Sequence, residues 1–548
     1  MAGIKFSRKE FEKQIKLTKE IEEKINLFGT NLESISDEEI EISVNPNRPD
    51  LYCFHGFIRA FLAFLGKKTG LKEYNVKKPE KNYEVKVESS VLNVRPYTAC
   101  AIIKNLKFND EKIKEIIDIQ EKIHMTLGRN RKKIAIGIYP LEKIKLPITF
   151  EARKPEDIKF IPLESEREMN GRQILSGHPT GREYAHLLEG KDKFPVFVDA
   201  SGEILSMPPI INSHKTGKIT ENTKEIFIEC SGFDLEVLKK TLNILVTMFS
   251  DMGGEIFQMN VKHKAGNYTT PELATEKMKI SAENANNLLG LNLNEKQIKE
   301  CLEKMGYNCN KGIVEIPSWR TDILHEVDLI EDVAIAYGYD KFEPEIPNIS
   351  FAGQEEDIEI KKRKIAEILS GLNMLETSSY HLTTEDDQLK KMGIKDKEGV
   401  IEVENSKTEY NLLRNNLLHI NLKILSENTN AEYPQRIFEL GRIFEKDSKG
   451  ETGINEIEKL CVCLTDSDAN FTSIKQVLDY LIRMLGKESE YKIENGEHPS
   501  FIDGRCGTVI INGKTIGFLG EITPQILENL KIKMPVCALE VDIEQLCK

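Results

Sequence analysis

Residues 313–342 constrain the fold more than any other segment, because their pattern predicts a strand, a short connection and a helix in immediate succession. The run at 314–316 reads as a strand. Helical periodicity begins at about Glu326 and stops at Gly338, and glycine commonly ends a helix. The segment therefore predicts a domain in which a strand leads directly into a helix.

Four carboxylates lie at this junction and on the first turns of the helix: Asp322, Asp328, Glu331 and Asp332. The last three stand at positions i, i+3 and i+4, so they share one helix face. Hard oxygen ligands of this kind can hold Mg²⁺ directly or through water. Acidic residues are also favoured at any helix N-terminus because they complement its exposed N–H groups. The spacing alone leaves both interpretations open.

Composition limits the class of protein. The chain has 548 residues, 40% hydrophobic and 30% charged, which indicates several folded domains rather than a disordered chain. No apolar run approaches the roughly 18 residues that span a membrane. Residues 1–16 lack the apolar core of a secretory signal. We therefore expect a cytoplasmic protein that does not associate with membranes.

Cysteine spacing and charge narrow the choice further. The ten cysteines form no CxxC pair and no zinc-ligand spacing, so we expect mostly buried, reduced thiols. The formal net charge of −13 is unfavourable for a polyanion such as tRNA. Any phosphate contact would thus need a local basic patch or a partner subunit.

Changes in pattern divide the chain into four expected domains, at 1–75, 76–267, 268–345 and 346–548. In the first, two prolines make the turn at 45–51 rigid, and Asp50 is expected to cap a helix at 54–65.

The densest basic cluster, residues 128–133, follows a helical pattern at 111–127 and precedes an apolar strand at 134–138. It is either a solvated loop or a contact for RNA phosphate or for a partner subunit.

The third domain predicts two short helices, at 282–289 and 295–305, with Ser281 and Asn294 as their N-caps. Helix–turn–helix followed by a strand is winged-helix-like. The second helix carries charges of both signs, whereas a DNA-recognition helix is usually basic. We therefore expect a structural or RNA-adjacent module and no DNA binding.

The fourth domain mixes strands, at 436–444 and 516–522, with helices at 358–369, 408–429 and 473–486. This order predicts an α+β domain with a mainly antiparallel sheet.

Four motifs carry a resemblance to a known family: NPNRPDL at 45–51, TLGRNRKKIAIG at 126–137, LSMPPIIN at 205–212 and SWRTDILHEVDLIEDVAIAYGYDKF at 318–342. Over essentially its whole length the chain resembles the β subunits of phenylalanyl-tRNA synthetases of the archaeal/eukaryotic type. The resemblance implies a multidomain α+β chain. Its parts would be a B3/B4 editing-type α/β module, a winged-helix-like B5 module and a C-terminal class II synthetase-like antiparallel sheet with helices.

The resemblance also implies an activity. Such an enzyme joins phenylalanine to its tRNA with ATP and Mg²⁺ as an α₂β₂ heterotetramer, and the four acids named above would hold Mg²⁺ near the α subunit. Class II sites hold ATP phosphates with arginines. Arg436 and Arg442 lie near a candidate strand pair, but the Arg-x-Glu pattern is absent. We therefore expect no catalytic residue for aminoacylation on this chain and assign amino-acid activation to the α subunit.

The B3/B4-like module would hydrolyse wrongly made tyrosyl-tRNA. Such a pocket must accept a phenol hydroxyl and orient a water molecule near the ester, and a site that hydrogen-bonds a hydroxyl discriminates strongly. The polar residues expected to do this are Ser206, Asn212, Glu229 and Ser231. They could equally be an ordinary polar strand edge.

Other enzyme classes lack support in the sequence, which contains no phosphate-binding P-loop, no GxGxxG, no HExxH and no nucleophile elbow. Two alternatives remain, a stand-alone hydrolase that acts on mischarged tRNA and a non-catalytic RNA-binding scaffold.

Overall fold

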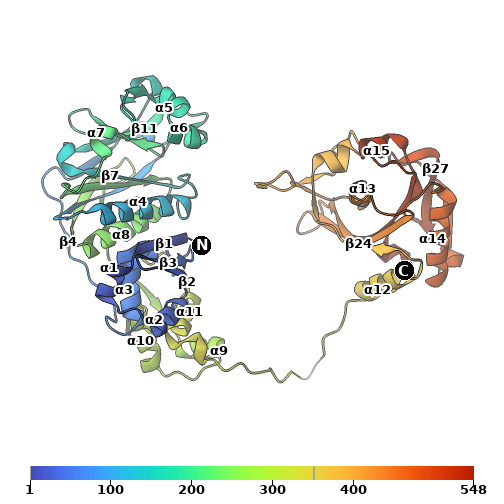
Figure 1. Ribbon diagram of the computed structural model, residues 1–548, viewed down its shortest axis with the longest axis horizontal. Helices are drawn as coiled ribbons and strands as arrows, with labels where there is room; N and C mark the ends of the chain where they lie inside the picture. Colours follow the sequence, from blue (N-terminus) through green and yellow to red (C-terminus); the bar gives the residue numbers. More distant parts are fainter. Residues whose placement is uncertain (1, 350–351, 548) are drawn as a thin grey trace. The chain divides into compact units, whose positions relative to one another are not determined.

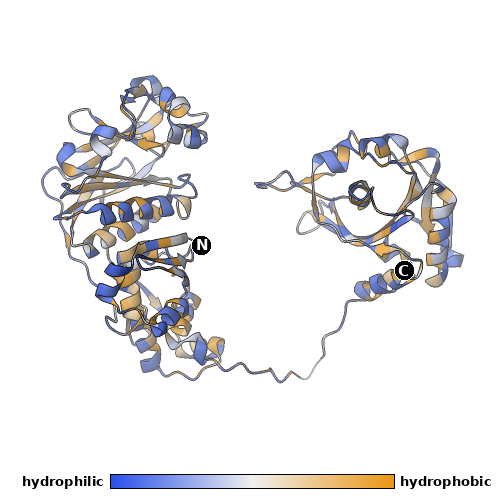
Figure 2. Cartoon of the chain, viewed as in Figure 1, coloured by the Kyte–Doolittle hydropathy of each residue, from blue (hydrophilic) through white to orange (hydrophobic). Residues whose placement is uncertain are grey.

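The computed structural model describes residues 2–349 and 352–547 and divides into two compact units, Met1–Ile346 and Pro347–Lys548 (Figure 1). Each unit has its own hydrophobic core. Helices in both units carry hydrophobic residues on one side and hydrophilic residues on the other, as amphipathic packing requires (Figure 2). No helix among the described residues has the length and hydrophobicity needed to cross a bilayer.

The first unit begins with a small antiparallel sheet in the order β1 (Ala2–Ser7), β3 (Glu39–Val44), β2 (Asn31–Ile35). Helices α1 (Arg8–Gln14), α2 (Lys19–Leu27) and α3 (Phe54–Phe64) belong to the same region. The predicted helix at 54–65 is confirmed, but its predicted cap is wrong. The Cys53 side chain accepts the N–H of Gly56, whereas the Asp50 carboxylate accepts two hydrogen bonds from the Arg48 guanidinium.

An eleven-stranded sheet forms the centre of the first unit. Its main path is β13-β12-β11-β8-β5-β15-β6-β14-β7, and β4 and β16 pair with β15. The strands are β4 (Val76–Lys77), β5 (Glu84–Val87), β6 (Tyr97–Lys104), β7 (Ile134–Pro140), β8 (Ile148–Arg153), β11 (Phe194–Val198), β12 (Ile204–Met207), β13 (Ile211–Asn212), β14 (Ile226–Gly232), β15 (Glu255–Lys262) and β16 (Tyr268–Thr270).

Two helices, α4 (Asp110–Met125) and α8 (Leu235–Asp251), cover one face of this sheet (Figure 1). Ile116, Ile119 and Ile123 of α4 pack with alternate residues of β7 and β14 in one core cluster. The intervening residues of the same strands, such as Tyr139 and Phe227, enter a second cluster on the other face. This alternation follows from the two-residue period of a strand.

The remaining part of the first unit contains a three-stranded sheet and three helices. They are β17 (Glu276–Lys279), α9 (Ala282–Leu289), α10 (Glu295–Lys304), β18 (Asn308–Asn310), β19 (Ile313–Ile316) and α11 (Glu326–Tyr337). The predicted N-caps Ser281 and Asn294 are confirmed, and Gly338 is the C-cap of α11.

The second unit is built on a seven-stranded sheet in the order β20-β24-β25-β29-β28-β27-β26, in which only the β20–β24 pair is parallel among the described strands. The strands are β20 (Leu375–Glu376), β24 (Gln435–Lys446), β25 (Ile454–Thr465), β26 (Tyr491–Asn495), β27 (Phe501–Ile511), β28 (Lys514–Ile522) and β29 (Val536–Asp542). The predicted mainly antiparallel sheet is confirmed.

Helices α12 (Asp357–Gly371) and α14 (Phe471–Met484) pack on one side of this sheet, and α13 (Leu418–Glu427) packs on the other. The predicted helix at 408–429 is wrong in its first half. Leu412 pairs with Thr383 and Glu402 of two short strands, and the helix begins only at Leu418, where Glu540 Oε2 accepts the N–H groups of Leu417 and Leu418 at 2.9 Å.

Candidate functional site

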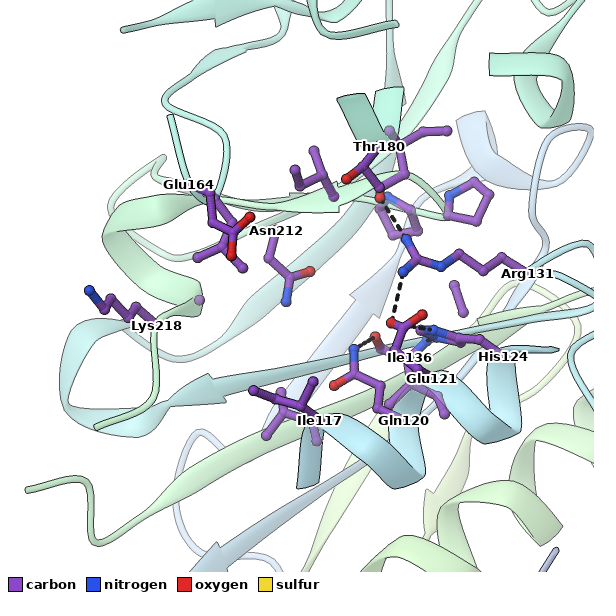
Figure 3. A pocket seen from close by; sticks show the side chains of 18 of the residues that line it. Ile117, Gln120, Glu121, His124, Arg131, Ile136, Glu164, Thr180, Asn212 and Lys218 are labelled. Atoms are coloured by element: carbon purple, nitrogen blue, oxygen red, sulfur yellow. Dashed lines mark hydrogen bonds and ion pairs between the residues drawn. The ribbon is translucent and has the colours of Figure 1, made fainter. Parts of the chain in front are cut away.

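A cavity of about 560 Å³ lies between α4, strand β7 and the segments at 163–180 and 208–219. Its wall combines apolar side chains of α4 and β7 with almost as many polar and charged ones. Figure 3 shows Glu121, His124 and Arg131 on one side of this cavity and Lys218 on the opposite side. All lining residues belong to the first unit.

The cavity lies where the two ends of the large sheet approach each other. Strand β7 ends the sheet path on one side, and β12 and β13 lie at its other end. The buried Tyr139 of β7 donates a hydrogen bond to Ser206 Oγ of β12 at 2.7 Å. Its hydroxyl also lies 3.4 Å from Asn212 Oδ1 of β13. The sheet is thus curled, and a phenol group bridges its ends.

Glu229 contributes the carboxyl group of this cluster. It lies on β14 opposite Gly137, and its Oε1 is 3.3 Å from the Tyr139 hydroxyl. Its other oxygen, Oε2, is buried and has no hydrogen-bond partner among the described residues. Burial raises the pKa of Glu229 to about 8, although the nearby Arg95 acts in the opposite direction. A buried carboxyl with one free oxygen is unusual and is a candidate ligand-binding group.

The four residues predicted for this site occupy different places. Asn212 and Glu229 line the cavity. Ser206 is buried behind it and joins the cluster through Tyr139. Ser231 lies apart from the cavity lining, where its Oγ accepts a hydrogen bond from Arg95 Nε at 3.1 Å.

Sequence reasoning missed most of the polar residues in the wall, among them Glu121, His124 and Arg131, and also the bridging tyrosine. Glu121, His124 and Arg131 form a chain of contacts, in which Arg131 Nη2 donates to Glu121 Oε1 at 2.8 Å. Burial opposes ionisation of Glu121, but His124 and Arg131 hold its pKa below the ordinary value. Burial lowers the pKa of His124, whose Nε2 accepts the N–H of Ile136 at 2.9 Å. Two features of the sequence could have indicated these residues. One is the helical face at 120–124, and the other is the basic run at 128–133.

The acidic set at the start of α11 is organised around an arginine. Arg320 is buried and donates two hydrogen bonds to Asp322, at 2.9 and 2.8 Å, and one to Asp332 at 2.7 Å. The Tyr307 hydroxyl also donates to Asp332. Burial alone would raise the pKa of Asp322, but the Arg320 charge holds it below its ordinary value.

The other two acids have separate roles or none. Asp328 Oδ2 accepts the N–H groups of Leu324 and His325, at 2.7 and 2.8 Å, and so caps α11. Glu331 is exposed. Across residues 2–349 and 352–547, no three His, Cys, Asp or Glu side chains are grouped as metal ligands. Two of the four carboxylates, Asp322 and Asp332, thus share Arg320, and Asp328 caps α11.

Two sequence motifs meet beside this cluster. Arg48 makes a bidentate pair with Asp50, at 2.9 Å for both bonds, and both residues line a second hollow together with Trp319 and Arg320. The guanidinium of Arg59 lies 4.8 Å from the Trp319 ring centre. The turn at 45–51 and the segment that follows β19 therefore pack beside each other, and their charged side chains are paired.

In the second unit, the arginines near β24 are differently occupied. Arg442 pairs with Glu456 and Glu458, whereas Arg414 is fully buried and pairs with Glu439 at 2.8 Å. Arg436 lines a shallow hollow at the start of β24.

Known protein families match successive parts of this chain. Three family models match in order: the B3/4 domain at residues 98–248, the tRNA synthetase B5 domain at 278–339 and the phenylalanyl-tRNA synthetase β chain CLM domain at 343–543. This set of domains, in this order, defines a subunit of an aminoacyl-tRNA synthetase.

Full-length relatives specify which synthetase. The phenylalanine–tRNA ligase β subunit of Thermococcus sibiricus is 40% identical over 500 residues, covering 90% of this chain and 88% of its own. The β subunit of Archaeoglobus fulgidus is 38% identical over 527 residues, covering 95% and 94%. The chain belongs to the family of phenylalanine–tRNA ligase β subunits.

A solved structure agrees. The N-terminal fragment of the phenylalanyl-tRNA synthetase β subunit of Pyrococcus horikoshii is 36% identical, with a TM-score of 0.59, and the match covers 61% of this chain and 99% of the fragment.

Proposed function

We propose that this chain acts with an α subunit, as an α₂β₂ heterotetramer in the cytoplasm, to attach phenylalanine to its tRNA with ATP. The proposal is supported by relatives of that name that match nearly the whole chain. Activation of phenylalanine is assigned to the α subunit. Arg442, one of the two arginines considered for ATP, is paired with Glu456 and Glu458.

The second activity proposed for this chain is hydrolysis of tyrosine wrongly attached to the tRNA. The observation that carries it is the free Oε2 of Glu229 at the wall of the cavity. A phenol hydroxyl could pair with this oxygen, whereas phenylalanine would leave it buried and unpaired. Leaving a buried polar group unpaired costs about 1–3 kcal/mol, which favours tyrosine over phenylalanine.

Mg²⁺ is proposed for the holoenzyme reaction, where it would neutralise phosphate charge. Of the four acids expected to hold it, Asp322 and Asp332 both pair with Arg320 and Asp328 caps a helix. We assign these three a structural role and leave Glu331 as the carboxylate free to meet a hydrated ion.

A hydrolase that works without the α subunit is the second candidate. It is favoured by one observation, that every residue lining the cavity lies in the first unit. A non-catalytic RNA-binding scaffold would instead leave the cavity inert.

Co-expression with the cognate α subunit, followed by light scattering and phenylalanine charging of tRNA, tests the proposal. A tetramer that charges tRNA only when both chains are present supports it. A monomer that ignores the α chain and still hydrolyses tyrosyl-tRNA supports the stand-alone hydrolase, and a monomer without either activity supports the scaffold.

A further inference from the structure

The basic segment between α4 and β7 has an uncommon backbone. Arg129, Asn130 and Arg131 follow one another with φ values of 47°, 53° and 63°. The left-handed region is unfavourable for residues with a Cβ, by about 1 kcal/mol or more each. Backbone hydrogen bonds hold the turn, including Lys133 N–H to Gly128 O at 2.8 Å. Disfavoured conformations of this kind cluster at functional sites.

The side chains of this turn divide into two sets. Arg131 turns inward, donates to Ile210 O at 2.9 Å, and stacks over the Tyr184 ring at 4.4 Å. Arg129, Lys132 and Lys133 are exposed, and their side chains form no hydrogen bond or ion pair with any residue that the structure describes. One arginine thus anchors the turn to the cavity wall, and three unpaired cations face solvent beside it.

This placement suggests a ligand. The cavity wall includes Arg131 and, on the opposite side, the exposed Lys218 (Figure 3). An ester at the 3′ end of a tRNA that enters the cavity must bring the last phosphates of the strand to its rim. We propose that Arg129, Lys132 and Lys133 bind these phosphates. The inference rests on the proposed hydrolytic function and specifies how its substrate is held.

The charge pattern favours RNA over a protein partner. Three cations without an interleaved acid form a uniform positive edge in a chain of net charge −13. Such an edge suits a flexible phosphate backbone, whose binding releases condensed counterions. The stiff, anchored turn reduces the entropy lost when the cations are immobilised on the phosphates.

The test compares two substrates of the α–β complex. One is tyrosyl-tRNA, and the other is the tyrosyl ester of adenosine, which has no phosphate. The variant carries Arg129→Gln, Lys132→Gln and Lys133→Gln. The matched control carries Lys78→Gln, Lys81→Gln and Lys264→Gln, three exposed cations of the same unit that lie outside the 128–133 turn.

We expect the variant to raise KM for tyrosyl-tRNA about tenfold, to keep kcat within about twofold and to cleave the adenosine ester like the wild type. The slope of log K for tRNA binding against log salt concentration should become shallower by about 2, because three phosphate contacts are lost. The control should change neither quantity.

Equal effects of the variant and the control on the tRNA substrate would overturn the inference, as would an equal loss on both substrates. If the wild type cleaves neither ester, the hydrolytic function fails. In that case the salt dependence of tRNA binding still tests whether the three cations contact phosphates, and an unchanged slope in the variant refutes that contact.

Discussion

The hydroxyl of Tyr139 donates a hydrogen bond to Ser206 Oγ at 2.7 Å, and this contact joins strands from opposite ends of the large sheet. The same hydroxyl lies 3.3 Å from Glu229 Oε1, so Tyr139 contacts one carboxyl oxygen, while Oε2 is buried without a hydrogen-bond partner among the described residues. If Glu229 recognises a substrate phenol as proposed, that recognition depends on a phenol that belongs to the protein.

Replacing Tyr139 by Phe should reduce selectivity more than it reduces activity. The loss of its hydrogen bonds frees Glu229 to rotate, which should lower the ratio of tyrosyl-tRNA to phenylalanyl-tRNA hydrolysis about tenfold, the equivalent of about one hydrogen bond. Tyr268→Phe is the control, because that hydroxyl donates to Thr98 O at 2.9 Å and does not line the cavity. Equal slowing of both esters would show that Tyr139 only supports packing.

Gly137→Ala should destabilise the first unit. A Cβ at this position would lie 2.1 Å from the Tyr139 hydroxyl and 2.5 Å from Glu229 Oε1. Overpacking of this kind costs about 1–3 kcal/mol and should lower the melting temperature together with tyrosyl-tRNA hydrolysis. Gly177→Ala is the matched control, because nothing lies within 4 Å of its added Cβ. An unchanged melting temperature for Gly137→Ala would contradict the close packing of this cluster.

Glu229 should make stability depend on pH. Its folded-state pKa, raised to about 8, lies above the unfolded value, so the folded state binds more protons between about pH 4.5 and 8. This group therefore reduces stability progressively as pH rises through that window. Glu229→Gln removes the effect, so the melting temperature of the variant relative to the wild type should rise from pH 5.5 to pH 8.5. A constant difference across this range would mean that Glu229 is ionised throughout.

Asp332→Ala should destabilise the first unit by about 2 kcal/mol, because Arg320 and the Tyr307 hydroxyl lose a buried charged acceptor while Arg320 keeps Asp322. Glu331→Ala should leave the melting temperature unchanged, since Glu331 is exposed. Added Mg²⁺ should not stabilise the isolated wild-type chain. If Mg²⁺ instead raises its melting temperature and Asp332→Ala abolishes the rise, the carboxylates do bind the metal, contrary to the arrangement seen here.

The sequence predicted local structure well where a single residue controls it. Ser281, Asn294 and Gly338 were placed correctly because caps depend on local backbone geometry. The start of α13 was missed because the pairing of Leu412 with Thr383 and Glu402 overrides helical periodicity. Asp50 was misassigned as a cap because spacing does not reveal a competing cation.

The candidate site shows the same limit. Asn212 and Glu229 were identified by residue type and their place on strands, and both line the cavity. Tyr139 and the inward turn of Arg131 could not be found from the sequence. Each depends on contacts between segments far apart in the chain. Arg320 likewise pairs with two of the four carboxylates expected to bind metal, Asp322 and Asp332.

The contacts of the Tyr139 hydroxyl span 67, 73 and 90 residues of sequence. Such long-range closure is a late and slow event in folding. A growing or partly folded chain would thus form strands and helices well before the ends of the sheet join at the candidate site. If local opening separates these ends, the contacts of Tyr139 are lost without unfolding either end, so the proposed hydrolysis of tyrosyl-tRNA should lose selectivity at temperatures below the melting temperature.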